Sequence, residues 1–100
     1  MVKAIWKGKG VVAESNDTQM VENNHYFPPD SIKSEFFQPV EGYTTRCGWK
    51  GTCYYYNLVT KDGAPPLEKV AWTYRDPLPA AKHIDGYVAF YKMRGVEIKE

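Results

Sequence analysis

Prolines interrupt this chain so often that every regular element must be short. A proline lacks the backbone N–H that a helix interior or a central strand uses, and it restricts the residue before it. These breaks predict that no helix exceeds about three turns, and they favour many short strands. The prolines that carry this prediction are Pro28, Pro29, Pro39, Pro77 and Pro79.

Turn residues divide the first part of the chain into predicted strands. Residues 4–6 are followed by Lys7-Gly8, and residues 10–14 return as a second strand, because a tight hairpin needs residues that accept positive φ. Ser15-Asn16-Asp17 predicts the next turn, and residues 18–22 a third strand. The three strands are expected to form a meander.

The second half of the chain contains the strongest strand patterns. Residues 51–60 form the longest predicted strand, and apolar side chains alternate along residues 70–75. Such alternation is typical of a sheet with one buried face. We expect Trp72 to be buried on that face, with Phe90 near it on the same side.

The remaining segments predict further short strands and two short helical elements. Residues 87–91 and 96–98 predict two further strands, the last at a sheet edge, and residues 79–84 predict one helical turn. Another short helix is expected from Asp30 or Ser31 to about Phe36, halted by Pro39. Together these elements predict a mainly β, single compact antiparallel β-sandwich or barrel-like domain over residues 1–100, with one or two short helical turns.

The charge and composition of the chain indicate which classes of binding partner are not expected. Thirteen basic and twelve acidic residues give a net charge of +1, and they alternate along the chain. A nucleic-acid partner is therefore not expected, because such proteins carry a basic stripe. No apolar run approaches the ~20 residues that cross a bilayer, so no membrane insertion is expected. Two cysteines are too few for a disulfide framework, and cytoplasmic residence is the expectation.

Cys47 and Lys50 are the candidates for chemistry on a substrate. Arg46 and Lys50 flank Cys47, and cations lower the pKa of a thiol and make it more reactive. The alternative is that Cys47 and Cys53 are small apolar residues that fill space. The acidic residues, Glu22 among them, are scattered over predicted turns and strand ends, which predicts solvated positions.

His83 is the predicted cofactor ligand. It precedes an aromatic strand that holds Tyr87 and Phe90, and haem needs an axial imidazole between apolar walls. We expect haem or a related tetrapyrrole with His83 on the iron, shared across a homodimer; the alternative is a surface histidine without a ligand. Zinc is not expected, because a structural site takes four N or S ligands and the chain offers C-x5-C and two distant histidines.

Several segments along the chain together form a recognisable pattern. They include Tyr26, Cys47, Trp49, Lys50, Gly51, Trp72 and Tyr74, and the run Val88-Ala89-Phe90-Tyr91 near the end. This pattern resembles the signature of a known family, the domain of unknown function 427, also labelled nucleotidyltransferase-9-like, and the resemblance covers nearly the whole chain in order. It implies a β-tent fold, related in shape to zinc-binding and methionine sulfoxide reductase domains, without their paired cysteines.

The functional hypotheses follow from the aromatic content, since Tyr pairs an apolar body with a polar hydroxyl. The leading hypothesis is a non-enzymatic module that binds a small ligand, with haem as the specific expectation. One alternative is a small enzyme that uses Cys47 or Lys50, and another is a structural domain that binds a protein partner through exposed tyrosines. The expected pocket residues are Tyr26, Cys47, Trp49, Lys50, Tyr55, Trp72 and Tyr74.

Overall fold

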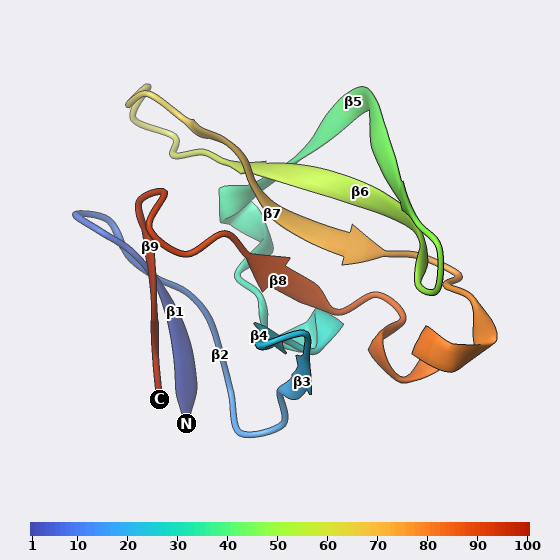
Figure 1. Ribbon diagram of the computed structural model, residues 1–100. Coiled ribbons are helices and arrows are strands. Elements are labelled where there is room, and N and C mark those ends of the chain that lie inside the picture. Colours follow the sequence, from blue (N-terminus) through green and yellow to red (C-terminus); the bar gives the residue numbers. More distant parts are fainter.

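Nine strands form three antiparallel sheets in the computed structural model, which describes residues 1–100 (Figure 1). The helical elements are three short 3-10 segments, so the predicted mainly β class with short helical turns is confirmed. The strands are β1 (Val2–Trp6), β2 (Gly10–Ser15), β3 (Gln19–Val21), β4 (Asn24–Tyr26), β5 (Phe37–Cys47), β6 (Gly51–Leu58), β7 (Leu67–Tyr74), β8 (Val88–Phe90) and β9 (Val96–Lys99). The 3-10 segments are η1 (Pro29–Ser31), η2 (Ser34–Phe36) and η3 (Pro79–Ile84).

The first sheet has the order β2-β1-β9 and lies to the left in Figure 1. Gly8 and Gly10 take φ of 84° and 122° at the β1–β2 turn, which L side chains rarely adopt. The predicted hairpin at these glycines is therefore confirmed. β9 pairs with the other side of β1 as an edge strand, as its sequence predicts, and this pairing brings the two ends of the chain together (Figure 1).

The second sheet is the small hairpin β3–β4, and it corrects the expected meander. The third strand pairs with β4 and not with β2, because other backbone occupies that side of β2. Ala13 forms a bridge with Ile32, and the backbone N–H of Lys33 donates to the carbonyl of Val12. A strand edge that is already hydrogen-bonded cannot accept a further neighbour.

The segment from residue 30 to residue 47 differs most from expectation. The expected single helix is two separate 3-10 turns, η1 and η2, and the chain then enters the long strand β5, which the sequence pattern did not indicate. Pro39 lies inside β5 and does not halt the chain. A proline is tolerated there because β5 is at the edge of its sheet, and the pairing with β6 is irregular between Pro39 and Thr44.

The third sheet has the order β5-β6-β7-β8, and residues 70–74 of β7 are buried on both faces. Ala71 pairs with Phe90 and Trp72 pairs with Ala89, so Trp72 and Phe90 point to opposite sides. The expectation that they share one face was wrong, although both side chains are buried. Alternating side chains along a strand indicate one buried face only when the other face is exposed. In this part of β7, both faces are buried.

Two cores result from this arrangement. The first contains Phe27, Phe90 and residues of β1, β2 and β9, and the second contains Tyr26, Trp72 and residues of β3, β6 and η3. η3 spans the predicted helical turn and contributes Ala81 and Ile84 to the second core. The second core is rich in tyrosine and carries the candidate site. None of the helical segments has the length and apolar character that crossing a membrane requires.

Candidate functional site

The turn between β5 and β6 places a lysine in the interior. Lys50 is only 6% exposed, an unusual position for this residue type. Gly51 fixes the turn: its φ is 112°, and a Cβ there would lie 3.4 Å from the backbone nitrogen of Leu78. That nitrogen donates a 3.0 Å hydrogen bond to the carbonyl of Lys50. Residues 77–78 therefore contact the turn at both Lys50 and Gly51.

The Lys50 ammonium forms an ion pair with the Glu22 carboxylate. Its Nζ also lies 5.1 Å from the ring centroid of Tyr74 and 5.4 Å from that of Trp49. Burying an unpaired charge is costly, so the carboxylate and the two aromatic rings make this position tenable. Burial lowers the pKa of Lys50, but the hydrogen bond to Glu22 and the surrounding negative charge outweigh it, and the pKa lies above its ordinary value.

Glu22 reaches Lys50 from the tip of the β3–β4 turn. Glu22 and Asn23 take positive φ of 51° and 68°, as a tight two-residue hairpin turn requires. The Glu22 side chain is 53% exposed, and its second carboxylate oxygen accepts a 3.4 Å hydrogen bond from the Trp49 indole. The hydrogen bond from Lys50 lowers the pKa of Glu22 below its usual range. Glu22 lies at an exposed turn position, as expected, and its carboxylate in addition pairs with the buried lysine.

A cavity of about 170 Å³ adjoins this ion pair, and we call it the Lys50 pocket. Trp72 and Tyr91 form one wall, with ring centroids 4.6 Å apart. The Trp72 indole N–H donates a 3.0 Å hydrogen bond to the hydroxyl of Tyr26, which lies edge-on to it. The lining residues are Glu22, Asn24, Tyr26, Lys50, Cys53, Tyr55, Trp72, Tyr74 and Tyr91.

Three tyrosines and one cysteine that line the pocket are neutral because their pKa values are raised. Burial raises the pKa of Tyr26, Tyr55 and Tyr74 above that of an ordinary phenol, and it also raises the pKa of the Cys53 thiol. Neutral phenols and thiols donate hydrogen bonds. The pocket therefore combines neutral donors with one cation, Lys50, whose present anionic partner is the Glu22 carboxylate.

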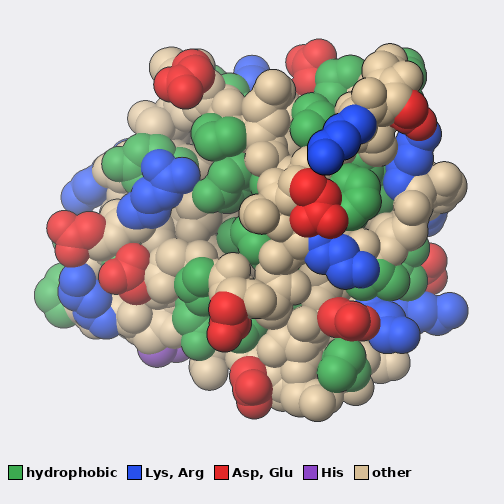
Figure 2. All heavy atoms as spheres, turned by 180° about the vertical axis from the view of Figure 1, so that it is seen from behind, with side chains coloured by type: hydrophobic (Ala, Val, Ile, Leu, Met, Phe, Trp, Pro, Cys, Tyr) green, Lys and Arg blue, Asp and Glu red, His purple; other side chains and the backbone are tan.

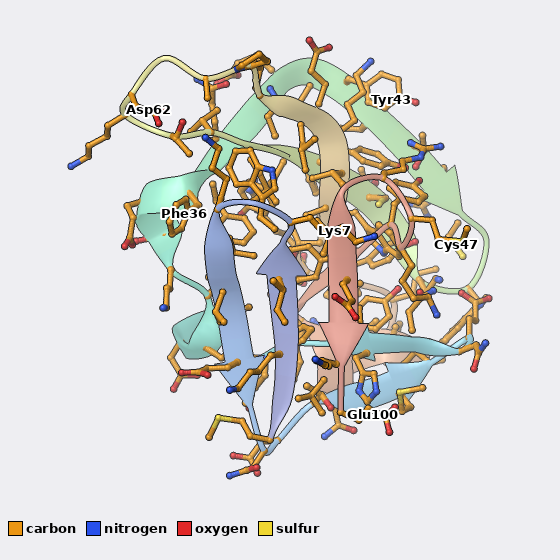
Figure 3. All side chains as sticks on the ribbon, turned by 90° about the vertical axis from the view of Figure 1, so that its left-hand side faces the viewer. Lys7, Phe36, Tyr43, Cys47, Asp62 and Glu100 are labelled. Carbon is orange, nitrogen blue, oxygen red and sulfur yellow. The ribbon has the colours of Figure 1, made fainter.

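Five of the seven expected pocket residues line this cavity: Tyr26, Lys50, Tyr55, Trp72 and Tyr74. The other two, Trp49 and Cys47, do not line it. Trp49 is 40% exposed and contacts Glu22, and Cys47, at the end of β5 (Figure 3), packs against the second core. The residues that sequence reasoning missed are Glu22, Asn24, Cys53 and Tyr91. A hairpin signal at Glu22-Asn23 was the available clue to the first two.

The residues expected to bind haem do not share a cavity. His83 is exposed on η3, Tyr87 packs against the second core, and Phe90 lies in the first core, 5.6 Å from Phe27 between ring centroids. None of the three cavities is lined by two of these residues. Haem ligation by His83 stays a prediction.

In each of two further cavities, a polar lining residue already has hydrogen-bond partners in the protein. In one of about 150 Å³, the His25 ring nitrogens lie 2.8 Å from the Thr18 hydroxyl and 2.9 Å from the carboxylate of Glu100, which Figure 3 labels at the end of the chain. In the other, of about 370 Å³, Arg75 lies over the Tyr54 ring and donates to the Tyr56 hydroxyl. Neither cavity buries a charge as the Lys50 pocket does.

The face of the molecule shown in Figure 2 has no concentration of one charge. On this face, acidic and basic side chains are interspersed. No three His, Cys, Asp or Glu side chains are grouped so that they could hold a metal ion.

Comparisons with known proteins give one match. The family model described as Domain of unknown function (DUF427) matches residues 1–99. A search of curated proteins finds no significant match.

Proposed function

For this chain, which belongs to the DUF427 family, we propose a binding role: the Lys50 pocket holds a small organic anion. The observation that carries the proposal is the buried ammonium of Lys50, which lies among neutral hydrogen-bond donors at a cavity. A cation that is only 6% exposed attracts an anion more strongly than a solvated one, because little water screens it.

The walls favour an organic anion over a simple inorganic one. Trp72, Tyr74 and Tyr91 present aromatic surface to the cavity, and such surface gains free energy when a ligand covers it. Ligand pockets in proteins are commonly apolar walls with a few polar groups that orient the ligand. Lys50 would orient the anionic end of the ligand, and the rings would contact its apolar body.

The size of the cavity limits the ligand. Its volume is about 170 Å³, whereas pockets for drug-sized molecules span roughly 300–1,000 Å³. We therefore propose a ligand the size of a single ring with one acidic group. A tetrapyrrole is much larger than this cavity, so haem at His83 is a separate hypothesis with its own test.

The protonation state of Lys50 favours a binding role over a catalytic one. A nucleophilic lysine needs a neutral amine, and enzymes obtain one by lowering the pKa of the lysine. Here the Glu22 carboxylate holds the pKa of Lys50 above its ordinary value. A permanent ammonium binds and orients an anion but does not attack a substrate.

Calorimetric titration with benzoate tests this function. We expect saturable binding of benzoate to the natural chain and no binding of benzyl alcohol, which has the same ring without the charge. Lys50→Met should abolish binding of benzoate. Lys69→Met is the matched control, because Lys69 also lies over an aromatic ring, at 4.2 Å from the Tyr43 centroid, but lines no cavity. Equal binding of benzoate to the Lys50 and Lys69 variants would refute the proposal.

A further inference from the structure

Glu22 already occupies the position that an anionic ligand would take. Its carboxylate pairs with Lys50, and Lys50 is the only cationic side chain that lines the pocket. Glu22 is also the only exposed residue of the lining, so it lies where the cavity meets solvent. A ligand carboxylate can reach the ammonium only if the Glu22 carboxylate moves away.

The hairpin allows this movement without unfolding. Other contacts hold β3–β4 in place: Tyr26 accepts the hydrogen bond from Trp72, and the Asn23 carbonyl accepts one of 3.2 Å from Lys92. The exposed Glu22 side chain can rotate into water, where its charge is well solvated. Two interactions keep the Glu22 carboxylate at the site: the ion pair with Lys50 and the long hydrogen bond from Trp49.

From this geometry we infer that the ligand is a monocarboxylate with a flat apolar body, which replaces the Glu22 carboxylate on Lys50. This inference rests on the proposed function. Glu22 then acts as a competing carboxylate within the chain, and it sets the ligand concentration at which the pocket fills. When no ligand is bound, Glu22 neutralises the buried ammonium.

Charge balance selects a monoanion over a dianion. Glu22 carries one negative charge and Lys50 one positive charge, so exchange for a monocarboxylate leaves the buried pair neutral. A phosphate dianion would bring an excess negative charge into the pocket, and the displaced Glu22 would remain nearby. The flat body is argued from the Trp72 and Tyr91 rings, which form one wall of the pocket.

The test compares Glu22→Gln with the natural chain. Glutamine keeps the length of the side chain but removes the competing charge, so benzoate should bind on the order of tenfold more tightly, the change that a hydrogen bond to a charged group commonly represents. Benzoate should also raise the melting temperature of this variant more than that of the natural chain. Glu68→Gln, at an exposed position of β7, should leave the affinity for benzoate unchanged.

A second variant keeps the test decisive if Glu22→Gln folds poorly. Trp49→Phe removes the indole hydrogen bond to Glu22 while leaving Lys50 and Glu22 in place. It should bind benzoate more tightly than the natural chain, by less than Glu22→Gln.

The outcomes separate the two proposals. If benzoate binding requires Lys50 but neither variant tightens it, competition by Glu22 is overturned and the binding function stands. If phenyl phosphate binds the natural chain more tightly than benzoate, the monocarboxylate class is overturned. If benzoate binds neither the natural chain nor Glu22→Gln, the binding function fails together with the inference.

Discussion

The indole N–H of Trp72 donates a 3.0 Å hydrogen bond to the hydroxyl of Tyr26, and this bond joins the β3–β4 hairpin to β7. Both side chains are buried, so neither group has access to bulk water as an alternative partner. Glu22 lies in the turn of the same hairpin. The bond therefore helps to hold the Glu22 carboxylate over Lys50.

Tyr26→Phe should lower the free energy of unfolding by about 1–3 kcal/mol, because it leaves the buried Trp72 indole without an acceptor. Urea denaturation measures this change. Tyr43→Phe removes a hydroxyl from a residue that is 41% exposed, and its effect should stay within about 0.5 kcal/mol. Equal stability of the two variants would show that the bond contributes nothing.

Gly51→Ala should destabilise the protein by about 1–3 kcal/mol, because its φ of 112° strains any L side chain and residues 77–78 lie against it. Gly48→Ala is the matched control in the same turn, with open space at its Cβ position. Thermal melts of the two variants test the turn geometry. A Gly51→Ala variant as stable as Gly48→Ala would mean that the turn does not hold Lys50 as described.

The Glu22–Lys50 ion pair should appear in the dependence of stability on pH. Because Lys50 lowers the pKa of Glu22, the pair contributes stability above the unfolded-state pKa of about 4.3 and loses it as the pH falls through the folded-state pKa. The difference in urea midpoint between the natural chain and Glu22→Gln should shrink between about pH 6 and pH 3. Glu68→Gln, at an exposed position of β7, is the control for the loss of a surface carboxylate. A difference for Glu22→Gln that does not change with pH would mean that the pair is not formed in solution.

Haem ligation by His83 has a distinct expected result. If haem binds there, His83→Ala should remove or shift the Soret absorbance band, and His25→Ala should leave it unchanged. Because His83 is exposed, its replacement should change the free energy of unfolding by no more than about 0.5 kcal/mol. Unaltered spectra in both variants would exclude histidine as the ligand.

Local patterns in the sequence predict local structure well, and contacts between distant segments poorly. The glycines after β1 indicate a hairpin because the requirement for positive φ is local. The pairing partner of β3 depends on Ile32 and Lys33, which occupy the edge of β2, and no pattern within β3 reports this. Pro39 is read as a break although an edge strand accommodates it.

The same distinction holds at the site. Lys50 attracts notice in the sequence because a charge between Trp49 and Gly51 needs a partner or water. Its partner Glu22 lies 28 positions earlier in the chain. The strands β4 and β5 and the 3-10 segments η1 and η2 lie between them. The turn at Glu22-Asn23 is a local feature, but nothing in the residues around Glu22 indicates that its carboxylate pairs with a lysine. Only the packing of the β3–β4 hairpin brings the two charges together.

The most direct measurement of the central claim is an NMR titration that follows the three indole N–H resonances while benzoate is added. Trp72 lines the Lys50 pocket, whereas Trp6 lies in the first core and packs against Phe36. We expect a saturable shift of the Trp72 resonance in the natural chain, no shift of Trp6, and no shift of Trp72 in Lys50→Met. A Trp72 resonance that stays in place, or that moves equally in Lys50→Met, would contradict the account.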